Sequence, residues 1–379
     1  MPFYNDRMPP PLDVCIRGAG VVGRTLALLL ARERLRVGLV EQPIAASSGH
    51  SDVRAYALNA ASRDLLDVLR AWPDPAHATP VLGMEVHGDE GGSVRFQPGA
   101  ADGPAMAWIV DVAALQQRLA DALRYQPLVT LLTAPQPAAL TVVCEGKSSS
   151  TRSEFGVGYT VTPYPQQAIA ARVACEKTHG QIARQWFANG EILALLPLEG
   201  PDLEHQGNSA ALVWSVGYER ARMLMQAPAP EFEAELARAT GATLGSLALT
   251  TERASWPLQL ARADRWCGPG WALAGDAAHT VHPLAGQGLN LGLADARELA
   301  KVIGAREYWR GVGDMKLLRR YERARKADVL AMGAATDGLQ QLFARQDTPS
   351  RWLRNRGMQG FDGSGPLKHW VARQAAGRF

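Results

Sequence analysis

The sequence is 379 residues long, with 47% hydrophobic and 20% charged residues. This composition excludes a wholly disordered chain, and the length favours two domains or one large composite domain. The formal net charge of +3 is unevenly distributed, because residues 301–379 carry 16 Lys and Arg against 7 Asp and Glu. This basic region is suited to anionic lipid or an acidic partner, or else it forms solvated helix faces; we expect no nucleic acid.

Cysteine usage and hydropathy indicate where the protein resides. The four cysteines are scattered without CxxC spacing, which argues against a disulfide framework or a zinc site and is typical of a reducing compartment. The N-terminal residues lack the order of a signal peptide, and charges interrupt every apolar run well short of about 18 residues. We therefore expect a cytoplasmic protein without a transmembrane helix.

The first predicted unit is a β-α-β unit. "LDVCIR" indicates a strand, "GAGVVG" a tight turn, "RTLALLLARER" a helix, and "LRVGLVE" a second, parallel strand that ends at Glu41. Gly18 permits the bend, Gly20 lets the backbone approach a pyrophosphate, and Gly23 lets the helix pack on the strand. Glu41 lies 18 residues after Gly23, where a carboxylate can bind ribose hydroxyls. This turn predicts dinucleotide binding but does not separate NAD from FAD.

The middle of the chain alternates between helix and strand patterns. Residues 134–165, rich in Pro, Ser and Thr, could not be assigned. The predicted elements, in order, are a helix at 57–72, a loop at 73–80, antiparallel strands at 81–88 and 92–98, a helix at 111–125, strands at 128–132, 167–175, 191–198 and 209–216, a helix at 230–240, strands at 243–250 and 271–276, and mainly helices from 289 onward.

A second glycine-rich stretch, "GDAAHTVHPLAGQGLNLG", indicates which of the two cofactors, NAD or FAD, the protein binds. A strand ends at Gly275-Asp276 and a helix begins near Gly286 and Gly288. A helix N-terminus without side chains presents bare N–H groups, which suit a ligand that becomes anionic, as the N1–O2 edge of a reduced flavin does. Asp276 can accept a hydrogen bond from a ribityl hydroxyl, and Pro283 fixes the turn while offering only a carbonyl. The stretch therefore favours FAD.

Two histidines in this stretch raise the alternative of a metal site. His279 and His282 are three residues apart, and Asp276 is the nearest further ligand type. A stable metal site needs a third or fourth ligand at suitable spacing, which the sequence lacks. We expect no metal, and we expect the histidines to form hydrogen bonds within the loop.

Together these two motifs resemble the class A flavoprotein monooxygenases, which have the para-hydroxybenzoate hydroxylase fold. "GDAAHTVHPLAGQGLNLGLADA" is similar to the ubiquinone-biosynthesis ring hydroxylases, "ARQWFANGEILALLPL" resembles their middle strands, and "LRRYERARKADVLAMGAATDGLQQLF" resembles their C-terminal helices. The resemblance covers most of the chain. It implies FAD as cofactor, NADH or NADPH as reductant, and hydroxylation of a phenolic ring by O₂ through a flavin C4a-hydroperoxide.

The resemblance also implies a role for individual residues. Arg54 would reach the flavin or its phosphates, Gln116 would lie near the cofactor, and Pro283 would shape the site of oxygen transfer through its backbone carbonyl, as the one candidate catalytic residue. The predicted cofactor-binding residues are Gly18, Ala19, Gly20, Val22 and Gly23 for the pyrophosphate, Glu41 for the adenosine ribose, Arg54, Gln116, Gly275, Asp276 for the ribityl chain, Pro283, Gly286, Gly288, Leu289 and Asn290.

The sequence departs from the family's DGxxSxxR motif. The nearest match is residues 145–152, "EGKSSSTR", in which Glu145 replaces the aspartate, and the segment before it is shorter than is usual. In the family this region supports FAD and the passage of NAD(P)H, so the departure bears on cofactor reduction. It motivates an alternative function, that of a flavin-binding accessory protein without hydroxylase activity.

The expected architecture is α/β. A Rossmann-like FAD-binding domain with a parallel sheet (1–72, 101–160 and 265–345) would hold an inserted antiparallel-sheet substrate domain (73–100 and 161–264), followed by a basic C-terminal helical region (346–379). The implied substrate is a polyprenylated phenol that enters from a membrane, with a small soluble aromatic as the alternative. Basic residues interleaved with apolar ones in 346–379 could contact anionic headgroups at the inner face of the membrane, or form a homo-oligomer contact.

Overall fold

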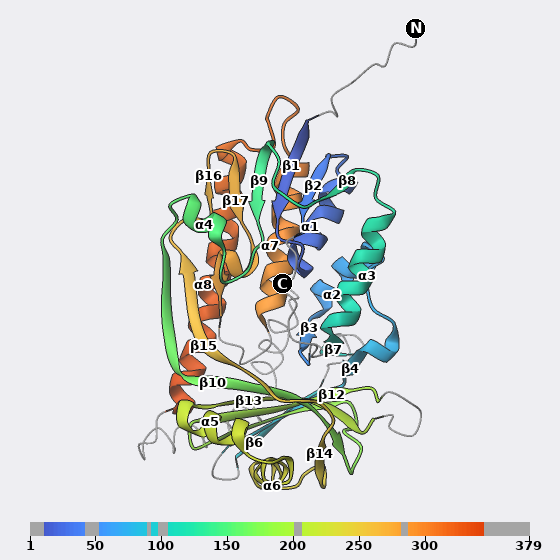
Figure 1. Cartoon of the computed structure of the whole chain (residues 1–379), viewed down its shortest axis with the longest axis vertical. Helices are drawn as coiled ribbons and strands as arrows, with labels where there is room; N and C mark the ends of the chain where they lie inside the picture. Colours follow the sequence, from blue (N-terminus) through green and yellow to red (C-terminus); the bar gives the residue numbers. More distant parts are fainter. Residues whose placement is uncertain are drawn as a thin grey trace.

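The structure is a computed structural model, and it describes residues 11–41, 53–88, 92–97, 105–200, 207–281 and 287–344, with side chains up to residue 331. Figure 1 shows one sheet in the upper half of the molecule and a larger sheet across the lower half. The upper sheet has six strands in the order β16–β17–β9–β1–β2–β8, which are parallel except for β16. Their bounds are β1 (Leu12–Arg17), β2 (Val37–Val40), β8 (Val129–Leu132), β9 (Ala138–Val143), β16 (Cys267–Gly268) and β17 (Trp271–Leu273).

Strands from distant parts of the sequence form the centre of this sheet. β1 lies between β2 and β9, and its Val14 pairs with Val37 on one side and Leu140 on the other. All three side chains are fully buried, as expected for a parallel sheet covered on both faces. The predicted parallel β-α-β unit is confirmed, and the previously unassigned segment supplies β9.

Helices with long apolar faces cover the parallel sheet. α1 contacts both α3 and α7, and α8 packs on α7. Leu26, Leu115 and Leu299, one from each of α1, α3 and α7, are fully buried in one hydrophobic cluster. The helices of this part are α1 (Val21–Arg32), α2 (Ala60–Val68), α3 (Val112–Arg124), α4 (Ser150–Glu154), α7 (Gln287–Gly304) and α8 (Met315–Ala344).

The lower sheet has nine strands and is mostly antiparallel. Eight strands follow the order β18–β15–β10–β13–β12–β11–β5–β6, and β14 pairs with β10. The predicted antiparallel pair at 81–88 and 92–98 is present, but its first strand also pairs in parallel with β11. The strands are β5 (Gly83–His87), β6 (Ser93–Phe96), β10 (Tyr159–Cys175), β11 (Ile182–Ala188), β12 (Glu191–Leu198), β13 (Ser209–Gly217), β14 (Leu247–Leu249), β15 (Ala254–Ala263) and β18 (His279–Thr280).

The two faces of the lower sheet have different partners. One face packs Trp214 against Phe232 of α6, together with buried Leu193 and Leu212. Figure 1 shows α5 and α6 beneath the sheet, on the side away from the parallel sheet. The bounds of these helices are α5 (Tyr218–Gln226) and α6 (Ala229–Thr240). The opposite face points toward the parallel sheet.

A small third sheet joins the two halves, in the order β3–β7–β4. Residues 73–80, expected to be a loop, instead contain the 3-10 helix η1 and the start of β4; Pro80 is tolerated because β4 is an edge strand. Its inner residues Val81 and Ile109 pack against Ala183 and Ala211 of the large sheet. The elements are β3 (Ala55–Leu58), η1 (Pro75–His77), β4 (Ala78–Val81) and β7 (Ala107–Asp111).

The other predicted elements are largely confirmed, with shifted bounds. The helix expected at 57–72 begins at Ala60, because its first residues belong to β3. The strand expected at 271–276 ends at Leu273 and continues into the 3-10 helix η3 (Gly275–Ala277). Among the described helices, none is long and apolar enough to cross a membrane. The basic region 346–379 lies outside the described residues.

Candidate cofactor and substrate cavity

The first glycine-rich turn lies at the carboxyl end of β1. Gly18 has a φ of 110°, and a Cβ there would lie 2.5 Å from the carbonyl oxygen of Cys144. A Cβ on Gly23 would lie 1.9 Å from the carbonyl oxygen of Gly18, so only glycine lets α1 start this close to β1. Gly20 is the exposed N-cap of α1, and no side chain caps the helix. The N–H groups of this first turn are therefore available to an anionic group such as a phosphate.

An arginine in α1 brings two of the predicted residues together. Arg24 Nη2 donates to Oε1 of Glu41 at 2.6 Å, and its Nη1 donates to the carbonyl oxygen of Gln116 at 2.9 Å. Glu41 directly follows β2, and its side chain is 47% exposed, so the carboxylate stays accessible. Sequence reasoning missed Arg24, which has no motif of its own. Ala19 packs against the core beside this turn, whereas Val22 lines a cavity.

The second glycine-rich stretch leaves β17 in a sharp turn. Gly275 has a φ of 63° and begins η3, which places Asp276 at the wall of the same cavity. Burial and the nearby Asp295 raise the pKa of the Asp276 carboxyl, and the positive charges of Lys147 and Arg54 partly oppose that effect. Arg54, which precedes β3, also lines the cavity.

The start of α7 faces the cavity with little side-chain bulk. A Cβ on Gly288 would meet no atom within 4 Å, and Gln287, Gly288 and Leu289 all line the cavity. Gly292, one turn later, is where α7 meets α1: a Cβ there would lie 2.7 Å from Cγ2 of Val22. The starts of α1 and α7 are thus in contact beside one cavity. No sequence motif predicts this contact of Gly292.

Asn290 has a structural role that the sequence analysis did not anticipate. Its Oδ1 accepts hydrogen bonds from the Asn59 backbone N–H at 3.0 Å and from Ser62 Oγ at 2.7 Å. Its Nδ2 donates to the Ala57 carbonyl oxygen at 2.8 Å, so the side chain ties α7 to β3 and α2. Of the other predicted residues, Pro283 and Gly286, and also His282, lie outside the described residues.

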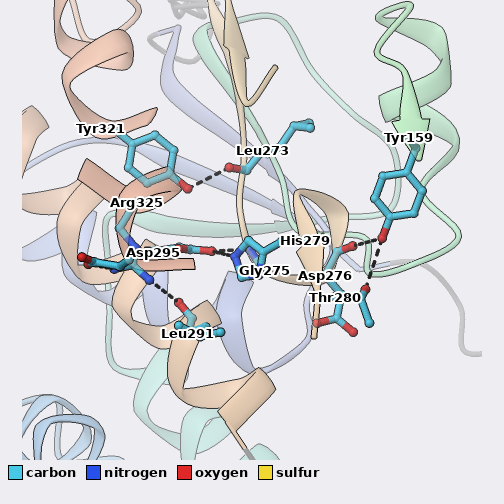
Figure 2. Close-up of polar contacts among 11 residues, drawn as sticks. Tyr159, Leu273, Gly275, Asp276, His279, Thr280, Leu291, Asp295, Tyr321 and Arg325 are labelled. Carbon is cyan, nitrogen blue, oxygen red and sulfur yellow. Dashed lines mark hydrogen bonds and ion pairs between the residues drawn. The ribbon is translucent and has the colours of Figure 1, made fainter. Parts of the chain in front are cut away.

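His279 is held by a carboxylate within the fold. Its Nε2 lies 2.6 Å from Oδ2 of Asp295, and its ring stacks on Trp266 with 4.8 Å between ring centroids. Figure 2 shows the imidazole directed toward α7. The described residues contain no group of three or more His, Cys, Asp and Glu side chains that could hold a metal ion.

The altered motif at 145–152 forms a well-bonded turn. Oε1 and Oε2 of Glu145 accept hydrogen bonds from the hydroxyls of Thr151 and Ser149, and Arg17 Nε lies 3.2 Å from Oε1. Burial opposes ionisation of Glu145, but these hydrogen bonds and Arg17 hold its pKa below the usual range. The ionised glutamate therefore accepts from the Thr151 N–H in the first turn of α4, whose N-cap is Ser149. The residues after it, Gly146 and Lys147, line the cavity.

A single large cavity connects these features to the lower sheet. Its volume is about 1440 Å³, and it reaches from Gly20 and Asp276 to the inner face of the large sheet. One row of its floor runs across five strands, and strand pairing places these residues side by side: Ala254, Ala170, Val213, Ala194 and Gln185. No lining residue from β10, β12 or β13 is charged. The floor is therefore mainly apolar and lined by small side chains.

Comparison with known proteins assigns the chain to a family. A family model described as FAD binding domain matches residues 136–335. The chain is 33% identical to the ubiquinone hydroxylase UbiL of Rhodospirillum rubrum, over 96% of this chain and 89% of that protein. The chain belongs to the FAD binding domain family. It is also 32% identical to the 3-demethoxyubiquinol 3-hydroxylase of Escherichia coli, over 97% of this chain and 99% of that protein.

Solved structures confirm the fold predicted for this FAD binding domain protein. PqsL, a probable FAD-dependent monooxygenase from Pseudomonas aeruginosa, superposes with a TM-score of 0.75 at 22% identity, over 93% of this chain and all of that one. The p-nitrophenol 4-monooxygenase PnpA from Pseudomonas putida gives a TM-score of 0.76 at 18% identity, over 97% of this chain and 98% of that one. The α/β fold with parallel and antiparallel sheets is that of the FAD-dependent monooxygenases.

The cavity of this FAD binding domain protein fits its cofactor. The start of α1 offers uncapped N–H groups of the kind that bind a pyrophosphate, and the close approach of α1 to β1 leaves no room for a Cβ at Gly23. Glu41 and Asp276 supply two carboxylates, one beside each glycine-rich turn, that can accept hydrogen bonds from sugar hydroxyls. The shape and the donor set therefore suit FAD.

Proposed function

We propose that the protein is an FAD-dependent monooxygenase that hydroxylates a phenolic ring in ubiquinone biosynthesis, with NADH or NADPH as reductant and O₂ as co-substrate. The observation that carries this function is one cavity that holds the uncapped start of α1, the start of α7 at Gly288, and a sheet floor whose residues from β10, β12 and β13 are uncharged. The two similar hydroxylases, whose names place them in ubiquinone chemistry, support the same reaction. When bound and reduced, FAD supplies the activated oxygen for such a reaction.

For the cofactor, we propose that each predicted residue acts where its element places it. The turn after β1 would bind the pyrophosphate, Glu41 the adenosine ribose, and Asp276 the ribityl chain. Arg24 would hold Glu41 in place, since their side chains are 2.6 Å apart. The start of α7 would lie against the flavin ring, with Gly288 leaving its N–H groups uncovered. The proposed role of the Pro283 carbonyl in shaping oxygen transfer stays a prediction.

For the substrate, we propose a lipid-tailed phenol whose ring lies over the large sheet. Ala170, Ala194 and Val213 offer an apolar surface that excludes water from the reacting atoms. Ser215, 4% exposed, lies in the next row of the floor and lines the cavity. It is suited to bind a phenolic or carbonyl oxygen of the ring. A small aromatic acid would instead need a cation beside its ring, and none of the lining residues from β10, β12 and β13 is charged.

Lipid-quinone profiling of a deletion strain tests the reaction. We expect the ubiquinone content to fall and a polyprenylated intermediate lacking one ring oxygen to accumulate. The wild-type gene should return both amounts to normal. Normal quinone content together with accumulation of a small soluble aromatic would contradict the lipid substrate.

Reduction of the flavin by NADH or NADPH distinguishes an active hydroxylase from a flavin-binding accessory protein. The purified holoenzyme, mixed anaerobically with NADH or NADPH, is expected to lose the visible absorption of oxidised flavin, and substrate is expected to accelerate this loss. Absence of bleaching by either nucleotide, with and without substrate, would favour an accessory role. Glu145→Asp, which restores the residue of the usual motif at the position that bonds Ser149 and Thr151, is the matched variant.

We propose that the basic region 346–379 contacts anionic lipid at the inner face of the membrane, which would give a lipid substrate access to the cavity. Flotation of the full chain with vesicles containing anionic phospholipid is compared with flotation of a variant in which Arg351, Arg354 and Arg356 are replaced by Gln. Each lysine or arginine near such a surface contributes about 1 kcal/mol, so binding should fall by roughly a hundredfold. Unchanged flotation would exclude this contact and favour a homo-oligomer contact, which sedimentation would detect.

A further inference from the structure

The backbone of residues 274–281, here called the Asp276 loop, is held from two sides. Figure 2 shows Asp295 and Arg325 on one side of the loop and Tyr159 on the other. The loop carries Asp276 to the wall of the cavity. Its position therefore depends on groups from helices and strands that themselves lie outside the cavity wall.

On the helical side, one fully buried carboxylate makes three contacts. Asp295 of α7 accepts a hydrogen bond from the Gly275 backbone N–H at 2.9 Å, and its Oδ2 lies 2.6 Å from His279 Nε2. Arg325 of α8 donates from Nε to Oδ1 at 2.7 Å and from Nη2 to the Leu291 carbonyl oxygen at 3.3 Å. Asp295 thus bonds the loop at two residues, Gly275 directly before Asp276 and His279 three residues after it.

On the sheet side, β10 and α4 fix the same short segment. The hydroxyl of Tyr159 donates to the carbonyl oxygen of Asp276 at 3.0 Å and lies 3.2 Å from Thr280 Oγ1. Arg152 donates from Nη1 to the Ala277 carbonyl oxygen at 3.1 Å and lies 3.5 Å above the ring of Tyr159. The backbone of Asp276 is thereby bonded through its own carbonyl and through its neighbours on both sides.

We propose that Asp295 is a positioning residue for the FAD site: its carboxylate, oriented by Arg325, sets the backbone of Gly275 and His279 and through them the cavity-facing side chain of Asp276. This inference rests on the proposed binding of FAD by Asp276. Asp295 does not line the cavity, so it acts through the loop and does not contact the cofactor.

The electrostatics of the cluster support a fixed, charged acceptor. Burial opposes the ionised form of Asp295, yet the charges and hydrogen bonds of His279 and Arg325 hold its pKa below the usual range. An ionised, fully buried carboxylate with these partners forms stronger hydrogen bonds than a neutral group would. Loss of its charge would also leave Arg325 with Asp328 as its remaining carboxylate partner among the described residues.

A double-mutant cycle on the full chain separates positioning from folding. FAD is removed, and FAD itself is titrated back into wild type, Asp295→Asn, Asp276→Ala and the double variant, with the Kd measured from quenching of flavin fluorescence. We expect Asp295→Asn to raise the Kd by about tenfold in the wild-type background, which corresponds to about 1.4 kcal/mol, and by less than about threefold when Asp276 is already absent. If Asp295→Asn raises the Kd by the same factor in the wild-type protein and in Asp276→Ala, the proposal is overturned.

Matched variants keep the test decisive. Glu322→Gln removes another partly buried carboxylate of α8, which accepts from the Trp266 N–H at 2.8 Å and does not contact the Asp276 loop. We expect it to lower the Tm of the apo-protein while leaving the FAD Kd unchanged. If Asp295→Asn does not fold, His279→Phe keeps the stacking on Trp266, removes the bond to Asp295, and is expected to raise the Kd in the same way.

The proposed function and this inference fail differently. Tight FAD binding that is insensitive to Asp276→Ala would overturn the role of Asp276 and with it the positioning by Asp295, even if the enzyme hydroxylates its substrate. If the protein does not hydroxylate, but Asp295→Asn still changes the FAD Kd more when Asp276 is present than when it is absent, the proposed reaction is overturned. The positioning role of Asp295 then stands.

Discussion

Gly20 and Gly23 occupy the same turn but meet different surroundings. An added Cβ at residue 23 would lie 1.9 Å from a backbone oxygen, whereas one at residue 20 would meet no atom within 4 Å. Backbone cannot yield as a flexible side chain can, so Gly23→Ala forces α1 away from β1. We expect Gly23→Ala to lower the Tm of the apo-protein by at least several degrees and to abolish FAD binding.

Gly20→Ala is the control for this pair of glycines. It adds the same methyl group into open space, so the Tm of the apo-protein should stay within about 1 °C of wild type. FAD binding should nevertheless weaken, because the methyl group stands where the pyrophosphate is proposed to approach. Equal losses of apo-protein stability in the two variants, measured by calorimetry, would contradict the steric explanation.

The ionised carboxylate of Asp276 is expected to lower the stability of the folded apo-protein, although it contributes to cofactor binding. Burial raises the pKa of its carboxyl in the folded protein. Such a group destabilises the fold at any pH where it is ionised, and this cost vanishes as the pH falls below its pKa in the unfolded chain, about 4. We expect Asp276→Asn to raise the apo-protein Tm at pH 7 and to weaken FAD binding.

The pH dependence of this variant provides the check. The gain in Tm seen at pH 7 should be lost as the pH falls through the raised pKa of the folded protein to about pH 4, because the wild-type carboxyl becomes protonated. A gain that is the same at both pH values, in calorimetric scans of the two apo-proteins, would show that the carboxylate charge is not its cause.

At the scale of elements, an ion pair joins the start of α3 to the large sheet. Oδ1 of Asp111 accepts from the N–H groups of Ala113 and Ala114, and its Oδ2 lies 2.5 Å from Arg172 Nη2 of β10. We expect Asp111→Ala to lower the free energy of unfolding by about 1–3 kcal/mol, because a helix cap and a charged hydrogen bond are both lost. Asp74→Ala, at an N-cap without a side-chain hydrogen bond, should stay within about 0.5 kcal/mol in the same urea titrations.

The row of small side chains across the large sheet sets the room for substrate. Ala194 lines the cavity, whereas Val161 of β10 is 44% exposed and does not. Ala194→Phe should therefore raise the KM for a lipid-tailed phenol by about tenfold or more, with FAD binding unchanged. Val161→Phe should change neither value. A normal KM in Ala194→Phe would show that the substrate does not rest on this row.

At the scale of the whole molecule, FAD is expected to link the two sheets and stabilise both. At a free concentration one hundred times its Kd, a ligand specific for the folded state adds about 2.7 kcal/mol. Thermal unfolding should therefore shift upward with FAD concentration. Riboflavin, which lacks the pyrophosphate and adenosine, should shift it less at equal concentration. Equal shifts would indicate that the turn after β1 does not bind the pyrophosphate.

The sequence predicted the parts of the fold that local patterns encode. Both glycine-rich turns, the parallel β-α-β unit and the long helices follow from spacing and periodicity, and the helix at 111–125 was placed within one residue at each end. Pairings between distant strands were not readable, such as β1 with β9 or β5 with β11. β4 was missed because Pro80 suggests a loop, and an edge strand tolerates proline.

The candidate site was predicted unevenly for the same reason. Residues with a motif, such as Gly18 and Asp276, could be proposed from the sequence, whereas residues that act by long-range contact could not. Arg24 and Arg325 look like ordinary helix surface charges in the sequence. Asp295 sits in an apolar helix without any spacing signal, and only tertiary contacts reveal its partners.

Helix α8 packs on the parallel part of the molecule, and the site cannot be complete until this helix has been synthesised. FAD can therefore bind only after that point. Tyr321 bonds the carbonyl oxygen of Leu273 at the end of β17, and Arg325 reaches the carboxylate that holds the following turn. Both residues emerge from the ribosome roughly 300 residues after the first glycine-rich turn, at about 5–20 residues per second. A nascent chain therefore exposes its nucleotide-binding turn for at least about 15 seconds before the second half of the site can close, so FAD should be captured late in synthesis.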